Sequence, residues 1–187
     1  MQNNAIIVRD FDSPLGPMMA GATSHGVCFL EWHDRGGTER IAARVEKRYG
    51  RPLATGDCDL LQTLADELAA YFSGQRRSFT VPTDVAGTEF ERAVWRELLA
   101  IPYGETRSYG QIAAAIGKPD AQRAVGRANR ANYLSILIPC HRVIEANGKL
   151  RGYGGGLWRK KWLLELESGS RAGVLPSIAG ERRCTVA

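Results

Sequence analysis

The stretch SYGQIAAAIGKPDAQRAVGRANR, residues 108–130, has the pattern of two short helices joined by a tight turn. Ser108 and Gln111 form a capping box, which predicts a helix that continues as far as Gly117. A second helix is predicted over about 120–130. Two short helices in this order indicate a helix-turn-helix, a motif whose second helix commonly enters a groove of DNA.

The second of these helices has two chemically different faces. Arg123, Arg127 and Arg130 stand at i, i+4 and i+7, within one narrow stripe. Small residues, among them Ala124 and Gly126, keep the helix thin enough to approach a groove closely. A solvated surface helix, with its small residues packed on the preceding helix, is the alternative interpretation.

Composition and charge favour DNA contact. The chain has 187 residues, 44% of them hydrophobic, and a formal net charge of +5, which is typical of a globular protein with a core. Residues 107–161 hold eleven Lys and Arg against only Asp120 and Glu145, which indicates a surface for a polyanion. We expect a cytoplasmic protein without membrane contact, because the chain has neither a long apolar run nor a signal-peptide pattern.

The N-terminal third has the alternating pattern of strands. Three apolar segments separated by turn-forming clusters predict an antiparallel meander; they lie at 5–11, 18–23 and 27–32. Two amphipathic helices are predicted to follow at about 38–49 and 59–73, and then a short strand at 78–81.

The remainder of the chain is predicted to be mainly helical. A capping box of Thr88 and Glu91 starts one helix, and a last helix is expected over about 157–167. Between them, Ile136-Leu137-Ile138 has the pattern of a buried strand. Residues 169–187 show little periodicity, so we expect a mobile tail there.

Cys140 follows that apolar segment directly, with His141 and Arg142 beside it. A cysteine after an apolar strand is most often a small buried hydrophobic residue. Here the neighbouring bases favour the thiolate, which is the form that attacks an electrophile. Adjacent side chains diverge in regular structure, so a contact between Cys140 and His141 requires an irregular turn or a bridging water. The four cysteines are too widely spaced for a paired metal or disulfide pattern.

The segment Ile138-Pro139-Cys140-His141-Arg142-Val143 stands at compatible distances from Ser108-Tyr109, Arg123-Ala124-Val125-Gly126, Asn132 and Trp162-Leu163-Leu164. In this arrangement the chain resembles the O6-alkylguanine-DNA alkyltransferases, most strongly over about 88–167. The resemblance implies an α+β fold, in which an N-terminal antiparallel sheet with helices, ribonuclease-H-like, is joined to a mainly helical, winged helix-turn-helix-like domain. The implied boundaries are 1–84 for the α/β domain, 85–168 for the DNA-binding and alkyl-acceptor domain, and 169–187 for the tail.

The function implied by this resemblance is direct DNA repair. Such a protein flips O6-alkylguanine out of the duplex and moves the alkyl group irreversibly to its own cysteine, here Cys140, once per molecule. O4-alkylthymine is a second candidate substrate. The resemblance further implies a monomer whose partner is double-stranded DNA containing O6-alkylguanine. No cofactor and no metal are expected, since Ala5 and Thr23 stand at two positions where some relatives carry zinc ligands.

The resemblance also assigns catalytic roles. Cys140 is the nucleophile, His141 the base acting through water, and Glu167 the carboxylate that holds the imidazolium. Tyr109 donates a proton toward the leaving guanine, and Asn132 is the hinge between the recognition helix and the active-site turn. Each also has a structural interpretation; Glu167, for example, could be a solvated acid in the last turn of a helix.

The DNA and base contacts come from the same resemblance. Arg123 is the finger that fills the gap left by the flipped base, with the helix in the minor groove. The rest of the DNA-binding set is Arg127, Arg130, Tyr109, Ala124 and Gly126. The base pocket is lined by the carbonyls of Cys140 and Val143, by Tyr153 and by the amide of Gly154. Tyr133 and Ser135 stand where many relatives have proline, so the pocket width is not predicted.

Three other classes of protein fit the sequence less well. A thiol hydrolase could use Cys140 and His141 but does not need the arginine stripe. A non-catalytic, alkyltransferase-like DNA binder would lack a nucleophile at position 140. A cofactor-dependent methyltransferase needs a glycine-rich turn after an early strand, whereas the glycine run here lies at 152–156.

Overall fold

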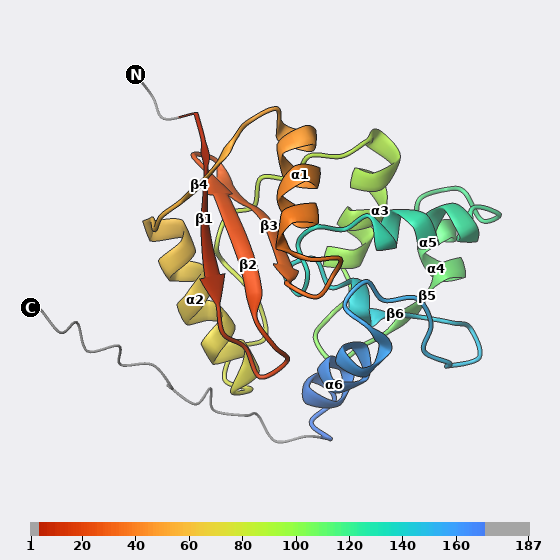
Figure 1. Cartoon of the computed structure of the whole chain (residues 1–187). Coiled ribbons are helices and arrows are strands. Elements are labelled where there is room, and N and C mark those ends of the chain that lie inside the picture. Colours follow the sequence, from red (N-terminus) through yellow and green to blue (C-terminus); the bar gives the residue numbers. More distant parts are fainter. Residues whose placement is uncertain (1–3, 171–187) are drawn as a thin grey trace, which may run out of the picture.

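The N-terminal part forms the predicted meander of three strands, shown in red and orange in Figure 1. The strands are β1 (Ile6–Phe11), β2 (Met18–Thr23) and β3 (Gly26–Trp32), paired antiparallel in sequence order. A further strand, β4 (Leu53–Thr55), pairs parallel with β1 and makes the sheet mixed, in the order β3-β2-β1-β4. Three residues are too few to show alternation, so the sequence did not predict β4. The computed structural model describes residues 4–170.

Two helices cover opposite faces of this sheet, and both occur where the periodicity predicted them. Helix α1 (Thr38–Tyr49) packs Ile41 and Val45 into a small apolar cluster with β1 and β3. Helix α2 (Asp59–Phe72) contributes its leucine stripe to the larger core on the other face. As a result, every residue of β2 and of the edge strand β3 is buried.

The prediction of a strand at 78–81 is wrong. The segment contains bends and pairs with no strand; an isolated bridge between Val27 and Thr83 follows it, and the Val27 amide donates to the Pro82 carbonyl at 2.9 Å. The carboxylate of Glu67 accepts from the amides of residues 80 and 81 instead. Pro82 has no N–H, and the amides of residues 80 and 81 are bonded to a side chain. These residues therefore have no free backbone donors with which to pair with a strand.

The C-terminal part is mainly helical, as predicted. Both capping boxes are present, at the starts of α3 (Glu89–Leu99) and α4 (Tyr109–Ala115). A turn leads from α4 to α5 (Gln122–Arg130), and α3, α4 and α5 pack on one another. Helix α6 (Leu157–Glu167) closes the described chain, and a small parallel pair links β5 (Arg107–Ser108) to β6 (Val143–Ile144).

The segment Ile136–Ile138 is buried as expected, but the prediction of a strand there is wrong. It forms a tight turn in which Ile136 has a φ of 71°, the left-handed region. The side chain of Asn132 satisfies the backbone that a strand would pair, because it accepts from the Leu134 amide and donates to the Ile138 carbonyl, each at 2.9 Å. The chain therefore enters Cys140 from a turn.

A single apolar core runs through the larger part of the molecule. It joins residues of α2 and β3 to residues of α3 and α6, for example Leu64, Leu30, Leu98 and Leu163. The boundary predicted between 84 and 85 lies in the extended connection before α3. Most of the tail predicted at 169–187 lies outside the described residues. Within residues 4–170 no helix is long and apolar enough to span a membrane.

Candidate active site

Cys140 begins a single 3-10 turn, η1 (Cys140–Arg142), between the hinge after α5 and strand β6. This is the irregular geometry that a contact between neighbouring side chains requires. Cys140 is 5% exposed. Its carbonyl accepts from the side chain of Asn129 at 3.3 Å. Asn129 escaped the sequence analysis because it lies on the buried face of α5, where the pattern indicated only packing.

His141 and Glu167, far apart in the sequence, are brought together. His141 is fully buried, and its Nε2 lies 2.8 Å from a carboxylate oxygen of Glu167. Arg142 donates two hydrogen bonds to the same carboxylate, at 2.7 and 2.9 Å, and Tyr71 of α2 donates a third at 2.6 Å. Glu167 is therefore not a solvated acid. It is 5% exposed and fully engaged.

The charges in this cluster determine which histidine nitrogen carries the proton. Burial raises the pKa of Glu167, but His141 and Arg142 outweigh it and hold that pKa well below its usual range. Burial lowers the pKa of His141, despite the opposing effect of Glu167, so the free imidazole is neutral. A neutral ring beside a carboxylate donates from Nε2. The buried Nδ1, which has no protein partner among the described residues, is then the basic nitrogen.

The Cys140 thiol has opposing influences. Burial raises its pKa, while a hydrogen bond from Asn132 and the charges of Arg35 and Lys160 lower it. Because burial outweighs the other effects, the free thiol is protonated and needs a base to become a nucleophile.

Lys160 is a buried cation that the sequence analysis missed. Its Nζ donates to the carbonyls of Val143 and Arg151, at 2.5 and 2.9 Å, and burial lowers its pKa to about 8. The residue occurs in a charged stretch of α6, which by itself looks like a solvated face. Lys160 ties β6 to the loop before α6.

Tyr153 and Gly154, assigned to the base pocket, belong to this loop, and Tyr109 contacts it. Tyr109 donates to the Arg151 carbonyl at 3.1 Å. Tyr153 is half-buried with its hydroxyl group enclosed, and its ring packs edge-on against Trp32 with ring centroids 6.0 Å apart. At Gly154 a Cβ would come within 2.5 Å of the guanidinium carbon of Arg35, so a side chain there would displace that guanidinium.

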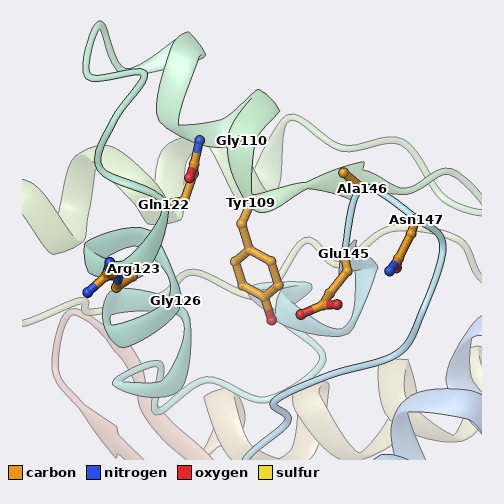
Figure 2. Close-up of a pocket in the computed structure, with 8 residues that line it drawn as sticks. All are labelled: Tyr109, Gly110, Gln122, Arg123, Gly126, Glu145, Ala146 and Asn147. Atoms are coloured by element: carbon orange, nitrogen blue, oxygen red, sulfur yellow. The ribbon is translucent and has the colours of Figure 1, made fainter.

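Figure 2 shows a groove of about 540 Å³ beside α5. It is lined by Tyr109, Gly110, Gln122, Arg123, Gly126, Glu145, Ala146 and Asn147. Burial raises the pKa of Tyr109, and the electrostatic effect of Cys140 raises it further. The tyrosine is thus common to the groove and to the surroundings of the thiol. Arg123, Arg127 and Arg130 are all exposed on α5, whereas Val125 and Ala128 are buried.

Tyr133 and Ser135, which stand where many relatives have proline, are not among the residues that line the groove. Tyr133 packs under the guanidinium groups of Arg44 and Arg48, whose carbons lie 4.8 and 4.1 Å from its ring centroid. Ser135 is buried and pairs through its amide with Leu30. No group of three or more possible metal-binding side chains occurs among residues 4–170.

The stability of the Glu167 cluster is open to measurement. Glu167→Gln is expected to lower the free energy of unfolding by about 3 kcal/mol at about pH 7, because Arg142 loses its buried partner. The folded-state pKa of Glu167 is depressed, so its stabilising contribution is present above the unfolded pKa and declines as the pH falls toward the folded value. Urea unfolding at about pH 7 and about pH 3 should therefore show a smaller difference at the lower pH. The exposed Glu105→Gln serves as control.

Comparisons with known proteins cover nearly the whole described chain. Residues 6–85 match the family model for the ribonuclease-like domain of 6-O-methylguanine DNA methyltransferase, and residues 89–169 match the model for its DNA-binding domain. The methylated-DNA–protein-cysteine methyltransferase of Mycobacterium tuberculosis is 48% identical over 167 residues, covering 88% of this chain and 93% of that protein. That of Methanosarcina acetivorans is 42% identical over 160 residues, covering 84% and 95%.

Solved structures give the same result. The crystal structure of Mycobacterium tuberculosis OGT in complex with DNA is similar with a TM-score of 0.75 and 44% identity, covering 87% of this chain and 93% of that one. The O6-methylguanine-DNA methyltransferase of Pyrococcus kodakaraensis is similar with a TM-score of 0.63 and 27% identity, covering 87% and 98%. Fold and sequence thus define a two-part methyltransferase with a cysteine in the 3-10 turn before β6. The chain belongs to the 6-O-methylguanine DNA methyltransferase family, and is an enzyme of the methylated-DNA–protein-cysteine methyltransferase class. The predicted family and fold class are confirmed.

Proposed function

We propose that this protein repairs double-stranded DNA by moving an alkyl group from O6 of guanine to Sγ of Cys140, once per molecule. The observation that carries the proposal is the series of a thiol, a neutral buried histidine and an ionised carboxylate, beside a helix with an exposed cationic face. The names of the relatives support the same chemistry. O4-alkylthymine is a second candidate substrate, and the acting form is a monomer in the cytoplasm that needs no cofactor.

In the first step the thiol of Cys140 loses its proton. Nδ1 of His141 accepts that proton through a bridging water, and the imidazolium that forms is stabilised by the carboxylate of Glu167. The hydrogen bond from Asn132 favours the thiolate. The sulfur then attacks the alkyl carbon, so that an S–C bond forms and the C–O6 bond breaks.

The electron pair of the broken bond passes to the guanine, which must gain a proton to leave as a neutral base. Tyr109 supplies this proton from its hydroxyl group. In the free protein that hydroxyl donates to the carbonyl of Arg151, so it must release Arg151 when the base enters. Burial raises the pKa of Tyr109, which keeps the hydroxyl protonated until the reaction.

The flipped base is held by main-chain groups. The carbonyls of Cys140 and Val143 accept from its exocyclic amine, while Tyr153 and the Gly154 amide line the other side. The Cys140 carbonyl already accepts two hydrogen bonds, from the side chain of Asn129 and from the Val143 amide, whereas the Val143 carbonyl accepts from Lys160. A carbonyl oxygen has two lone pairs, so the Val143 carbonyl keeps an acceptor site for the base, and the Cys140 carbonyl gains one when Asn129 releases it.

The helix-turn-helix of α4 and α5 is proposed to lie in the minor groove. Arg123 takes the space of the flipped base, and Arg127 and Arg130 contact phosphates. Ala124 and Gly126 leave the helix surface low enough for a close approach. Arg123 lines the groove beside Tyr109, which fits an entry path for the base (Figure 2).

Intact-mass measurement after mixing with duplex DNA that contains O6-methylguanine tests the proposal. The expected result is one added methyl group, mapped to Cys140, with no further turnover after one equivalent of DNA. Repeated turnover of an ester or amide substrate without a stable adduct would instead indicate a thiol hydrolase.

The relay from Cys140 to Glu167 makes a separate prediction. His141→Ala and Glu167→Gln are each expected to slow methyl transfer by about 10² or more, since general base catalysis contributes roughly that much. Both should also move the pH dependence of the transfer rate, because thiolate formation then depends on the raised pKa of Cys140 alone. Single-turnover rates over a pH series measure both effects. Rates and profiles unchanged in both variants would remove the relay from the mechanism.

A further inference from the structure

Arg35, in the turn after β3, reaches from the N-terminal part to the end of α5. Its Nη2 donates to the Arg130 carbonyl at 2.5 Å, and its Nη1 donates to the Asn132 carbonyl at 2.9 Å. Carbonyls at the end of a helix lack intrahelical partners and carry partial negative charge, so a guanidinium stabilises them. Arg35 therefore fixes the main chain on both sides of the point where α5 becomes the hinge.

A buried carboxylate sets the orientation of Arg35. Glu31 of β3 is fully buried and pairs with Arg35, and its second oxygen accepts from Arg44 at 3.1 Å. A buried carboxylate is costly unless it is paired. Glu31 and Arg35 thus hold each other in one geometry, and the side chain of Arg35 is only 11% exposed.

The same guanidinium touches the loop assigned to the base pocket. Its carbon atom would lie 2.5 Å from a Cβ at Gly154, so a larger residue at position 154 would push Arg35 out of its present position. The neighbouring Tyr153 packs on Trp32 at the end of the same strand, β3. Trp32 at the end of β3 and Arg35 in the turn after it therefore contact two adjacent residues of the loop, Tyr153 and Gly154.

The main chain that Arg35 holds is also connected to the thiol of Cys140. The Asn132 side chain holds the turn that leads into Cys140, since it accepts from the Leu134 amide and donates to the Ile138 carbonyl. Asn132 also lowers the pKa of the thiol. The groups whose charge acts on Cys140 come from several elements: Arg35 and Lys160 favour the thiolate, and Glu31 opposes it. Cys140 in turn raises the pKa of Tyr109 and of Tyr153, in addition to the larger effect of burial on each.

We propose that Arg35 is a positioning residue for alkyl transfer, which holds the end of α5, Asn132 and Gly154 in register with Cys140 and places a fixed positive charge near the thiol. The inference rests on the proposed function, because it takes Cys140 as the reacting thiol. It gives the N-terminal part of the chain a role in the chemistry as well as in folding.

The first test measures thiol reactivity without any DNA. Iodoacetamide labelling of Cys140, assigned by peptide mass, is followed over a pH series in the wild type, Arg35→Met and Arg35→Lys. Arg35→Met is expected to raise the pH midpoint and slow labelling near neutral pH by about threefold to tenfold, since each pKa unit changes the thiolate fraction about tenfold. Arg35→Lys retains the charge and should keep the wild-type midpoint. An unchanged midpoint in Arg35→Met overturns the proposal.

The second test measures single-turnover methyl transfer from O6-methylguanine duplex DNA. Arg35→Lys is expected to be several-fold slower than wild type, because an ammonium cannot reproduce the planar fork that spans two carbonyls. Arg44→Met is the matched control, since it also removes a partner of Glu31 but no hydrogen bond to the main chain after α5; Arg48 still packs on Tyr133 in this variant. Equal rates in wild type and Arg35→Lys, or equal losses in Arg35→Lys and Arg44→Met, would contradict the positioning role.

The two tests separate this inference from the proposed function. If the wild type itself accepts no methyl group from the DNA, the proposed function fails, while iodoacetamide labelling still decides the role of Arg35. Circular dichroism shows whether each variant is folded. If Arg35→Met does not fold, Arg35→Gln, which keeps an amide donor but no charge, takes its place in the labelling comparison.

Discussion

Replacing Cys140 with alanine is expected to abolish methyl transfer completely while changing the affinity for duplex DNA by no more than about twofold. The thiol is only 5% exposed, and the basic residues of α5 stand apart from it on the exposed face of the helix. Phosphate contacts supply most of the free energy of binding to DNA, so a buried thiol adds little to it. Intact mass measures the transfer, and fluorescence anisotropy at fixed salt measures the binding.

Cys58→Ala is the matched control, because this half-buried cysteine precedes α2 and lies outside the site. It should keep both activities. Loss of transfer and DNA binding together in Cys140→Ala would show that the cysteine is needed for the fold, and a lowered melting temperature would accompany that result. Retained transfer in Cys140→Ala would rule out Cys140 as the acceptor.

Arg123→Ala should lower repair of duplex DNA by about 10² or more, while the reaction with free O6-alkylguanine base stays near the wild-type rate. Without the finger, the flipped state loses the group that offsets a few kcal/mol of unstacking. A free base needs no flipping, so its reaction depends only on the pocket and the thiol. Single-turnover rates with both substrates measure the contrast.

Arg127→Ala is the control from the same exposed face of α5, since Arg123 lines the groove but Arg127 does not. Loss of one phosphate contact should weaken binding to all DNA about equally and reduce the salt slope by about one. If Arg123→Ala slowed the free base and the duplex alike, the finger assignment would be wrong, and Arg123 would act on the pocket.

Much of the fold could be predicted because its signals are local. The capping boxes at Thr88 and Ser108 mark helix starts directly, and the periodicity of α1 and α2 gives their extent. The sequence predicted two strands that the structure lacks, at 78–81 and at 136–138. In both segments backbone groups are hydrogen-bonded to a side chain, Glu67 in the first and Asn132 in the second. Hydrogen bonds from side chains to the backbone depend on the tertiary structure, and the periodicity of the sequence does not indicate them.

The candidate site divides in the same way. Cys140, His141 and Glu167 were proposed through a family resemblance, and the structure brings the last two within hydrogen-bond distance. The residues that support them were not predicted: Tyr71, Asn129, Lys160 and Arg35. Each is a polar side chain whose burial arises from packing between distant segments. In the sequence alone they look like ordinary surface or core positions.

The hydrogen bond between Tyr71 and Glu167 has a consequence for how the protein can be divided. One carboxylate joins α2 to α6, and the apolar core crosses the same boundary. A fragment that starts after residue 84 would leave this carboxylate without its phenol and expose the leucines that face α2. The two segments that match separate family models are therefore expected to unfold together, as one cooperative unit.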